Sequence, residues 1–502
     1  MTRRRARTRQ KNAIQQMPYR QVRNPFSPME VLTPEQIERI HGSSMRVLEE
    51  TGLHVMDTEA RSIFKAGGFS VDETNQRVRF DRDGLMALVA KAPSSFSIRG
   101  RDPNKRITVG EGNMCFAAVA GPPFVSDLDH GRRAGSYEDM CNVMKIVHSL
   151  NILHNMGGCS VEPVDLPAES RYLDFYLQSC LLSDKPWKPV TIGRHKARDA
   201  LAMAKIMLQA SDEALAADPV FYVNTNTNTP LVLDPEIAQG VIEFARAGQA
   251  VCVTPFALAG AMAPATVAGA LTLQNAETLA ACALVQLVRP GCPYIYGSFV
   301  CNADMRSGSP AFGTPEYALG AQASGQMARH YGLPWRSSNA NASNAPDAQA
   351  AYEAQMALWG AITGHVSILH QGAGWLEGGL VASYEKLIID AEMLQMMAAW
   401  MDGLTINEDE IGLDAISEVG PGGHFFGTAH TLERYEHAFY QPLLSDWSNF
   451  ENWADAGSKD AATRANGIWK SLLQDYEPPE IDIAIKDELE DYVARRKREL
   501  HQ

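Results

Sequence analysis

The sequence lacks the short motifs that mark the common nucleotide, hydrolase and metal sites. No G-x-G-x-x-G turn follows an apolar run, and neither a Walker loop nor a G-x-S-x-G elbow occurs. H-E-x-x-H is also absent, and His424, His430 and His437 are too loosely spaced for a recognised zinc signature. These absences argue against dinucleotide-binding, P-loop and serine-hydrolase functions, and we expect no metal site.

Paired cysteines are missing as well. The chain has eight cysteines, but none of them forms a C-x-x-C pair. Neither a disulfide framework nor a zinc ribbon is therefore indicated. We interpret the eight as reduced thiols of a cytoplasmic protein.

Positive charge is scarce. The formal net charge is −14, which argues against a nucleic-acid partner. The opposite balance occurs only at the start, where "MTRRRARTRQK" is strongly basic, and we predict that residues 1–24 form a disordered arm. Docking to an acidic partner is an alternative role. This start lacks the apolar stretch of a signal peptide, whereas its arginines alone do not exclude a transit peptide.

Residues 247–276 contain no charge, as a membrane span would. Pro255, Pro264 and many small residues interrupt this stretch. A buried strand, a glycine-rich turn and a core helix fit it better, so no membrane partner is expected.

A two-part pattern repeats from about residue 111. A short apolar run ends in small or polar residues, and a long amphipathic stretch follows it. Eight such units occur between residues 111 and 402. Their apolar runs are "CFAAVAGPPF", "ILHNMGGCSV", "PVTIG", "VFYVNTN", "VCVTPF", "YIYGSFV", "WRSSNAN" and "VSILHQG". Eight strand–helix units predict a (β/α)₈ barrel, a TIM barrel. Residues 25–110 read as an α+β N-terminal extension, and residues 403–502 as a helical C-terminal extension packed on the barrel.

Several helix starts in this pattern have clear capping residues. Ser136 precedes Asp139 by three residues, Asp234 precedes a proline, and Thr314 precedes another proline. Such residues satisfy the free N–H groups of a first helical turn. We therefore predict helices that begin at residues 137, 235 and 315.

In a barrel, functional groups lie where the strands end. His370 closes the eighth predicted strand, before a glycine-rich turn. Asn224 and Asn226 follow the fourth strand, and Asn339 and Asn341 follow the seventh. Turn capping is the ordinary role of such asparagines, but two amide-rich ends at one mouth favour orientation of a polar ligand.

Carboxylates and aromatic rings complete the candidate site. Glu162 and Glu377 also follow strand ends and could offset a ligand cation. Phe256, Phe299 and Trp375 are candidates for a cage around a quaternary ammonium group, although most rings near strand ends belong to the core. We leave the catalytic residues unassigned.

Five stretches resemble the trimethylamine methyltransferase superfamily over residues 25–480. They are "GSSMRVLEETGLHV", "GTPEYALGAQASGQMARHYGLP", "NAPDAQAAYEAQMALWGAITGH", "HQGAGWLEGGLVASYEKLIIDAEML" and "VGPGGHFFGTAHT". Members that use trimethylamine place pyrrolysine at the mouth, by motif order within residues 338–343. This chain has ordinary residues there and resembles the non-pyrrolysine branch.

That branch implies demethylation of glycine betaine to the cob(I)alamin of a separate corrinoid protein. No D-x-H-x-x-G corrinoid signature occurs in this chain, so the cobalamin is expected on the partner alone. A betaine nitrogen is already quaternary, so its methyl group can leave without a general acid, and the enzyme mainly positions it. The resemblance implies that His370, as a neutral donor or an imidazolium, binds the substrate carboxylate. A bond to a backbone carbonyl is its ordinary alternative.

Alternatives remain open at this level. The substrate could instead be proline betaine, carnitine, γ-butyrobetaine or a tertiary methylamine. The chain could also be a betaine-binding protein without catalysis. A homo-oligomer is equally compatible with the sequence, provided that the mouth stays free.

Overall fold

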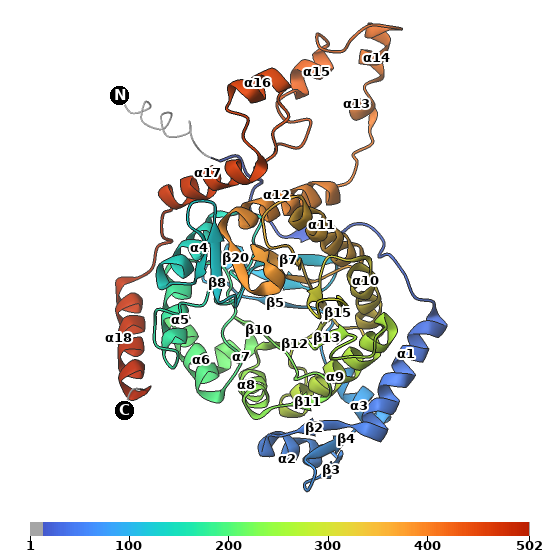
Figure 1. Cartoon of the computed structure of the whole chain (residues 1–502), viewed down its shortest axis with the longest axis vertical. Coiled ribbons are helices and arrows are strands. Elements are labelled where there is room, and N and C mark those ends of the chain that lie inside the picture. Colours follow the sequence, from blue (N-terminus) through green and yellow to red (C-terminus); the bar gives the residue numbers. More distant parts are fainter. Residues whose placement is uncertain (1–13, 501–502) are drawn as a thin grey trace.

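The computed structural model describes residues 14–500 and is built around one curved sheet (Figure 1). This sheet has seven strands in the order β1-β7-β18-β17-β14-β12-β10, and all neighbours except β1 and β7 are parallel. The strands are β1 (Val22–Arg23), β7 (Asn113–Ala118), β10 (Tyr222–Thr225), β12 (Ala250–Val253), β14 (Tyr294–Gly297), β17 (Trp335–Ser338) and β18 (Ile368–Ala373). The first and last predicted strands, β7 and β18, are neighbours, so the sheet curls back on itself.

The second and third predicted strands are not formed as strands. Residues 152–163 touch β7 through one bridge, Ala117 to Asn155, and residues 189–193 contain no strand. Two hydrogen bonds join these segments, from Met156 N to Pro186 O at 2.9 Å and from Lys188 N to Gly157 O at 2.8 Å. A regular ladder fails here because Pro186 and Pro189 have no N–H donor and Gly157 has a φ of +69°.

Helices that lie between the sheet strands in sequence, and one after β18, surround the sheet (Figure 1). They are α4 (Tyr137–Ser149), α5 (Arg171–Leu181), α6 (Arg194–Leu208), α7 (Asp212–Ala217), α8 (Pro235–Arg246), α9 (Val267–Val288), α10 (Pro315–His330), α11 (Ala348–Thr363) and α12 (Tyr384–Met401). The three predicted helix starts are confirmed: Ser136, Asp234 and Thr314 each accept a hydrogen bond from the N–H three residues later.

The uncharged stretch contains the predicted buried strand, β12, and the start of the predicted core helix, α9. A second short strand, β13 (Phe256–Ala259), forms where part of the turn was expected. α9 is long and apolar enough to cross a membrane by length and composition alone. However, 78% of its apolar window is buried within the protein. It is a core helix, and the α1, α3 and α10 helices pack against it.

The first hundred residues mix short strands with helices. They form α1 (Pro34–Arg46), η1 (Val47–Thr51), β2 (Leu53–Val55), α2 (Thr58–Ala66), β3 (Ser70–Asp72), β4 (Arg77–Arg79), α3 (Arg82–Val89), β5 (Phe96–Ile98), η2 (Pro103–Lys105) and β6 (Ile107–Val109). The start of the expected disordered arm lies outside the described residues. Residues 14–24 are not a free arm, because β1 pairs with β7 and Met17 N donates to Gln395 Oε1.

The C-terminal hundred residues divide into two parts (Figure 1). α17 (Ala461–Gln474) packs on α12 and α4, and α18 (Ile483–Leu500) packs on α5 and α6. Between α12 and α17, a segment with short helices extends away from the rest of the protein. Its helices are α13 (Glu408–Ile411), α14 (Leu413–Val419), α15 (Ala429–Arg434) and α16 (Phe450–Asp455).

Short strands that follow the sheet strands shape its carboxyl end. They are β8 (Phe124–Asp127), β9 (Gly131–Ala134), β11 (Val232–Leu233), β13, β15 (Phe299–Ala303), β16 (Pro310–Ala311), β19 (Trp375–Leu376) and β20 (Val381–Ser383), with the turn η3 (Glu377–Gly379). β13 pairs in parallel with β15, and β20 pairs in parallel with β8. These layers enclose the space above the sheet.

Candidate active site

Two adjoining cavities open at the carboxyl ends of the sheet strands. The larger has a volume of about 390 Å³, and we call it the mouth cavity. The smaller, of about 170 Å³, is the aromatic pocket. Asn224, Asn226 and Gln371 line both cavities, so the two form one continuous site.

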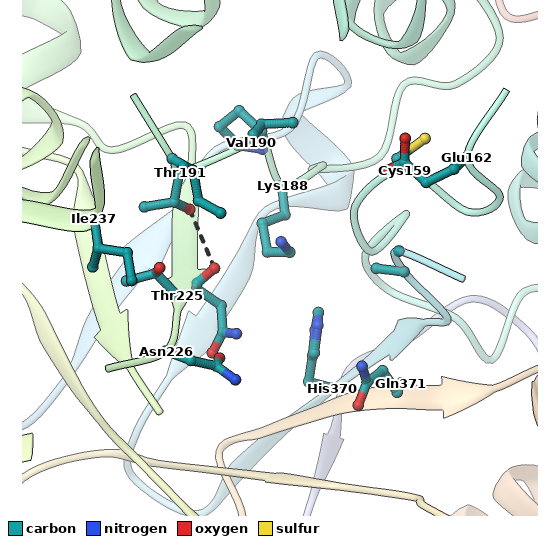
Figure 2. Close-up of a pocket in the computed structure, with 15 residues that line it drawn as sticks. Cys159, Glu162, Lys188, Val190, Thr191, Thr225, Asn226, Ile237, His370 and Gln371 are labelled. Atoms are coloured by element: carbon teal, nitrogen blue, oxygen red, sulfur yellow. Dashed lines mark hydrogen bonds between the residues drawn. The ribbon is translucent and has the colours of Figure 1, made fainter. Parts of the chain in front are cut away.

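His370 lies on β18 and points into the mouth cavity (Figure 2). Its Nδ1 lies 2.8 Å from the hydroxyl of the buried Tyr222 on β10. Burial, with the charges of Arg336 and Lys188, holds the pKa of His370 well below its ordinary value. Burial also raises the pKa of Tyr222 far above its ordinary value, so the phenol keeps its proton. We infer that Tyr222 donates to Nδ1, which leaves Nε2–H as a neutral donor toward the cavity.

Four aromatic rings wall the aromatic pocket. They are Phe256, Phe299, Phe312 and Trp375. Phe299 lies at the centre of the group, with ring centroids 5.3 Å from Phe256, 5.4 Å from Phe312 and 6.4 Å from Trp375. Faces and edges of this kind attract a quaternary ammonium group where water is excluded. The three predicted rings are therefore brought together with one that sequence reasoning missed.

A buried arginine closes the aromatic pocket. Arg336 is on β17, is 3% exposed, and its guanidinium lies 5.5 Å from the Phe299 centroid. Nη1 donates to the carbonyl of Ser298 at 3.1 Å, whereas Nε is buried without an acceptor. Within residues 14–500 no carboxylate pairs with this guanidinium. Burial lowers the pKa of Arg336, but an arginine keeps its charge, so the site contains an unneutralised cation.

A second cation faces the mouth cavity. Figure 2 shows Lys188 pointing toward the same space as His370 and Asn226. Burial, followed by the charge of Arg336, lowers the pKa of Lys188 to about 8. No ion pair holds its ammonium group among the residues that the structure describes. The two cations together favour a ligand that brings a negative group.

Asn224 and Asn226 extend from the end of β10 into both cavities, as predicted. Asn224 Oδ1 accepts from the hydroxyl of Thr254 at 2.7 Å. The loop after β10 is held by hydrogen bonds to Glu277 on α9. This buried carboxylate accepts from the Thr229 hydroxyl at 2.8 Å and from Leu231 N at 2.7 Å. The amide groups are therefore held in place by the core.

Glu162 also lines the mouth cavity, but it is already paired. Its Oε2 lies 3.2 Å from Nε of Arg171. Burial raises the pKa of Glu162, and the Arg171, Lys196 and Lys188 charges oppose that rise. This carboxylate is therefore less available to a ligand cation than an unpaired one would be.

Three other predicted residues line neither cavity. Asn339 and Asn341 are fully buried and support the end of β18 and the start of β19: Asn339 Nδ2 donates to Gly372 O at 2.9 Å, and Asn341 Nδ2 to Trp375 O at 2.8 Å. Glu377 forms an ion pair with Arg132 at 2.9 Å. The two amides thus position the loop that carries Trp375.

Sequence reasoning missed Arg336, Lys188, Phe312 and Gln371. Two of them left a signal, because Arg336 is the one charge in the apolar run "LPWRSS" and Lys188 stands just before "PVTIG". A charge within a predicted buried strand needs a partner or a function. Gln371 gives no such signal; it has a φ of +55° and accepts from Ser338 Oγ at 3.3 Å.

A family model described as trimethylamine methyltransferase (MTTB) matches residues 1–501. The chain belongs to this family. A glycine betaine methyltransferase of Desulfitobacterium hafniense (strain Y51) is 37% identical over 94% of this chain and 98% of its own length. The trimethylamine methyltransferase MttB of Methanosarcina barkeri (strain Fusaro) is 30% identical over 93% of this chain and 95% of its own. The chain is therefore an enzyme, a methyltransferase.

Among solved structures, a hydroxylamine complex of MtmB aligns with a TM-score of 0.49 and 11% identity. It covers 91% of this chain and 92% of its own. The Methanosarcina barkeri monomethylamine methyltransferase MtmB aligns with a TM-score of 0.47 and 12% identity.

Proposed function

We propose that this methyltransferase takes a methyl group from a betaine, glycine betaine first, and delivers it to the cob(I)alamin of a separate corrinoid protein. The observation that carries the proposal is the pairing of an aromatic pocket with buried cations that lack a carboxylate partner. Aromatic faces suit a trimethylammonium group, and Arg336 with Lys188 suits a carboxylate. A betaine carries both groups in one molecule.

Charge separates a betaine from its competitors. Choline or protonated trimethylamine would bring a second positive charge next to the buried, unpaired guanidinium of Arg336. In a dry pocket that repulsion is strong. A zwitterion instead neutralises the guanidinium while its ammonium group meets the rings. The small volume of the aromatic pocket, about 170 Å³, favours a short betaine over longer carnitine-like molecules.

The carboxylate of the betaine can also contact His370 and Lys188 in the mouth cavity. Nε2–H of His370 provides a neutral donor, and Lys188 provides a charge when it is protonated. The neutral form of His370 is favoured over an imidazolium, because two cations already surround it. The order of importance for the carboxylate is then Arg336, Lys188 and His370.

The reaction requires no general acid or base from the chain. The methyl carbon–nitrogen bond breaks as the corrinoid accepts the methyl group, and the nitrogen leaves with its electron pair as a neutral amine. The residues exclude water, hold the carboxylate and direct one methyl group toward the opening. A cavity of about 390 Å³ is far smaller than a corrinoid, which fits a cobalamin that stays on its own protein and approaches from outside.

The ordinary residues at positions 338–343 support the same substrate class. Most of them are buried at the end of β17 or just after it, and Asn339 and Asn341 hold neighbouring loops. Trimethylamine without a proton would have to expel an amide anion, which is a poor leaving group. A quaternary amine avoids this, so positioning is sufficient.

The purified chain with free cob(I)alamin tests the proposal. We expect methylcobalamin to form, by its absorption spectrum, with glycine betaine and more slowly with carnitine or γ-butyrobetaine. Trimethylamine should give none. A rate with trimethylamine that matches every betaine would overturn the substrate class. Tight betaine binding without any methylcobalamin, both free and with corrinoid protein, would identify a binding protein instead.

We also propose how the rest of the chain is organised. Residues 111–402 form a (β/α)₈ barrel in which residues 152–163 and 186–193 take the second and third strand places, supported by their hydrogen bonds to each other and to β7. Residues 25–110 and 403–502 are its extensions. Eight free cysteines support a cytoplasmic location.

A further inference from the structure

The last strand of the sheet, β18, is irregular where it meets the site. Between Leu369 and Ala373 it advances four residues, while its neighbour β7 advances two, from Phe116 to Ala118. Gln371 lies in this bulge with a φ of +55°. Residues other than glycine rarely adopt this left-handed conformation, and strain of this kind is concentrated at functional sites. The fold therefore keeps a strained residue at the edge of the cavities.

The bulge changes the direction of the side chains. In a regular strand, consecutive side chains point to opposite faces. His370 and Gln371 are consecutive, yet both line the mouth cavity (Figure 2). Gln371 also lines the aromatic pocket, which His370 does not. Gly372 suits the bend, because a Cβ there would lie only 3.1 Å from the carbonyl oxygen of Ala117. The glutamine side chain is therefore placed at the junction of the two cavities.

The carboxamide of Gln371 is held at its oxygen. Oε1 accepts a hydrogen bond at 3.3 Å from Oγ of Ser338, which is buried at the end of β17. Within residues 14–500 no acceptor binds the Nε2 group of Gln371. Its two N–H donors are therefore available to a ligand at the junction. Arg336 lies two residues before Ser338 on β17 and lines the aromatic pocket with Gln371, so the guanidinium and this amide can meet the same ligand.

We propose that Gln371 sets the length of betaine that the site prefers, by donating to the ligand carboxylate at the junction of the two cavities. This role rests on the proposed function. Glycine betaine has a single carbon between its nitrogen and its carboxylate. With the trimethylammonium group among the rings, its carboxylate stays beside the aromatic pocket, within the space that Arg336 and Gln371 line. The amide adds a hydrogen bond without a further charge, next to a guanidinium that already supplies one.

The place of Gln371 in the sheet distinguishes it from the other two amides at the junction. Asn224 and Asn226 also line both cavities. They follow β10, however, and β12 and β14 lie between β10 and β17 in the sheet order. β18 pairs directly with β17. Gln371 is therefore the junction amide on the strand next to Arg336, where both groups can bind one carboxylate.

A longer betaine uses different donors. γ-Butyrobetaine has three carbons between its nitrogen and its carboxylate, so that carboxylate lies about 2.5 Å further from the nitrogen. With the ammonium group in the same pocket, the carboxylate passes the junction and enters the mouth cavity, which Lys188 and His370 line. The hydrogen bond to Gln371 is then lost. Gln371 therefore favours the shortest betaine.

Calorimetry with matched ligands tests this role. Gln371→Met keeps an unbranched side chain of similar length and removes both N–H donors. It should weaken glycine betaine binding by about 10-fold or more, as for one hydrogen bond to a charged group, and change γ-butyrobetaine and choline binding by less than about 3-fold. Gln371→Glu should weaken glycine betaine further and tighten choline, because it places a negative charge at the junction. The control Gln349→Met removes an exposed glutamine that donates to Glu353 and should alter none of these affinities.

A glycine variant separates ligand contact from support of the fold. Gln371→Gly relieves the left-handed backbone and removes the amide. It should unfold at no lower urea concentration than the unmodified chain and still lose affinity for glycine betaine. Equal losses for both betaines, or for glycine betaine and choline, would overturn the role of Gln371 and leave the proposed function intact if the unmodified chain forms methylcobalamin with glycine betaine. An unmodified chain that forms none with any betaine would overturn the proposed function, and this role with it.

Discussion

Arg336 gives the sharpest test of the site, because its removal should affect two ligands in opposite directions. In Arg336→Met the guanidinium is lost while an apolar side chain of similar length fills its place beside Phe299. A charge-assisted hydrogen bond is worth about 1.5–3 kcal/mol, so glycine betaine should bind roughly 10- to 150-fold more weakly. Choline has no carboxylate and should bind equally well or more tightly, since a buried positive charge has been removed.

Calorimetry with both ligands measures the difference. The control is Arg329→Met, which removes an arginine that donates to Gly364 O at 2.7 Å and lies 32% exposed, away from both cavities. It should change neither affinity. Equal losses for betaine and choline in Arg336→Met would refute the reasoning, because they would show that Arg336 holds the fold of the pocket and not the carboxylate.

Other predictions follow from the neighbouring groups. His370→Ala should weaken betaine binding more than choline binding, by up to about 10-fold for one neutral hydrogen bond, and equal losses by calorimetry would indicate a structural role. The pKa of Lys188 is about 8 in the free protein and should rise beside the carboxylate of a bound betaine. Betaine affinity should therefore fall as the pH rises above 8, and this fall should vanish in Lys188→Met. A Lys188→Met variant with the same pH profile as the unmodified chain would exclude a role for the lysine. Asp390→Ala should cost about 3–5 kcal/mol in urea unfolding, because it leaves Lys386, its fully buried partner, unpaired, whereas a loss below 1 kcal/mol would contradict that pairing.

The site also depends on buried groups that never touch a ligand. Asp390 accepts from Asn339 Nδ2 at 3.2 Å and from Gly374 N at 2.9 Å, and Asn341 holds the carbonyl of Trp375. The loop that carries Trp375 is therefore tied to α12 and to the end of β17. Asn339 and Asn341, which were predicted to bind the ligand, instead hold the loop that positions the Trp375 ring in the aromatic pocket.

Local patterns alone determined much of this protein. Apolar runs that alternate with amphipathic stretches predicted the parallel strands and their helices, because a buried strand and a surface helix have different hydrophobic periods. Capping residues located helix starts to the residue at Ser136, Asp234 and Thr314. The strand ends also predicted His370, Asn224 and the ring of Phe256 as lining residues, since parallel strands bring their carboxyl ends to one edge.

Only the tertiary structure decided the rest. The second and third predicted strands form no regular ladder with their neighbours. Whether a ladder forms depends on which N–H and C=O groups face each other in the fold, and Pro186 and Pro189 provide no N–H donor there. Asn339 and Asn341 share the composition of a ligand-binding loop with Asn224, and only their buried partners show that they support the fold. The lone charge of Arg336 in an apolar run indicated either a partner or a function, but the sequence could not decide between them. Charge neutralisation depends on three-dimensional neighbours, and no local pattern tells whether a carboxylate from another strand will meet the guanidinium.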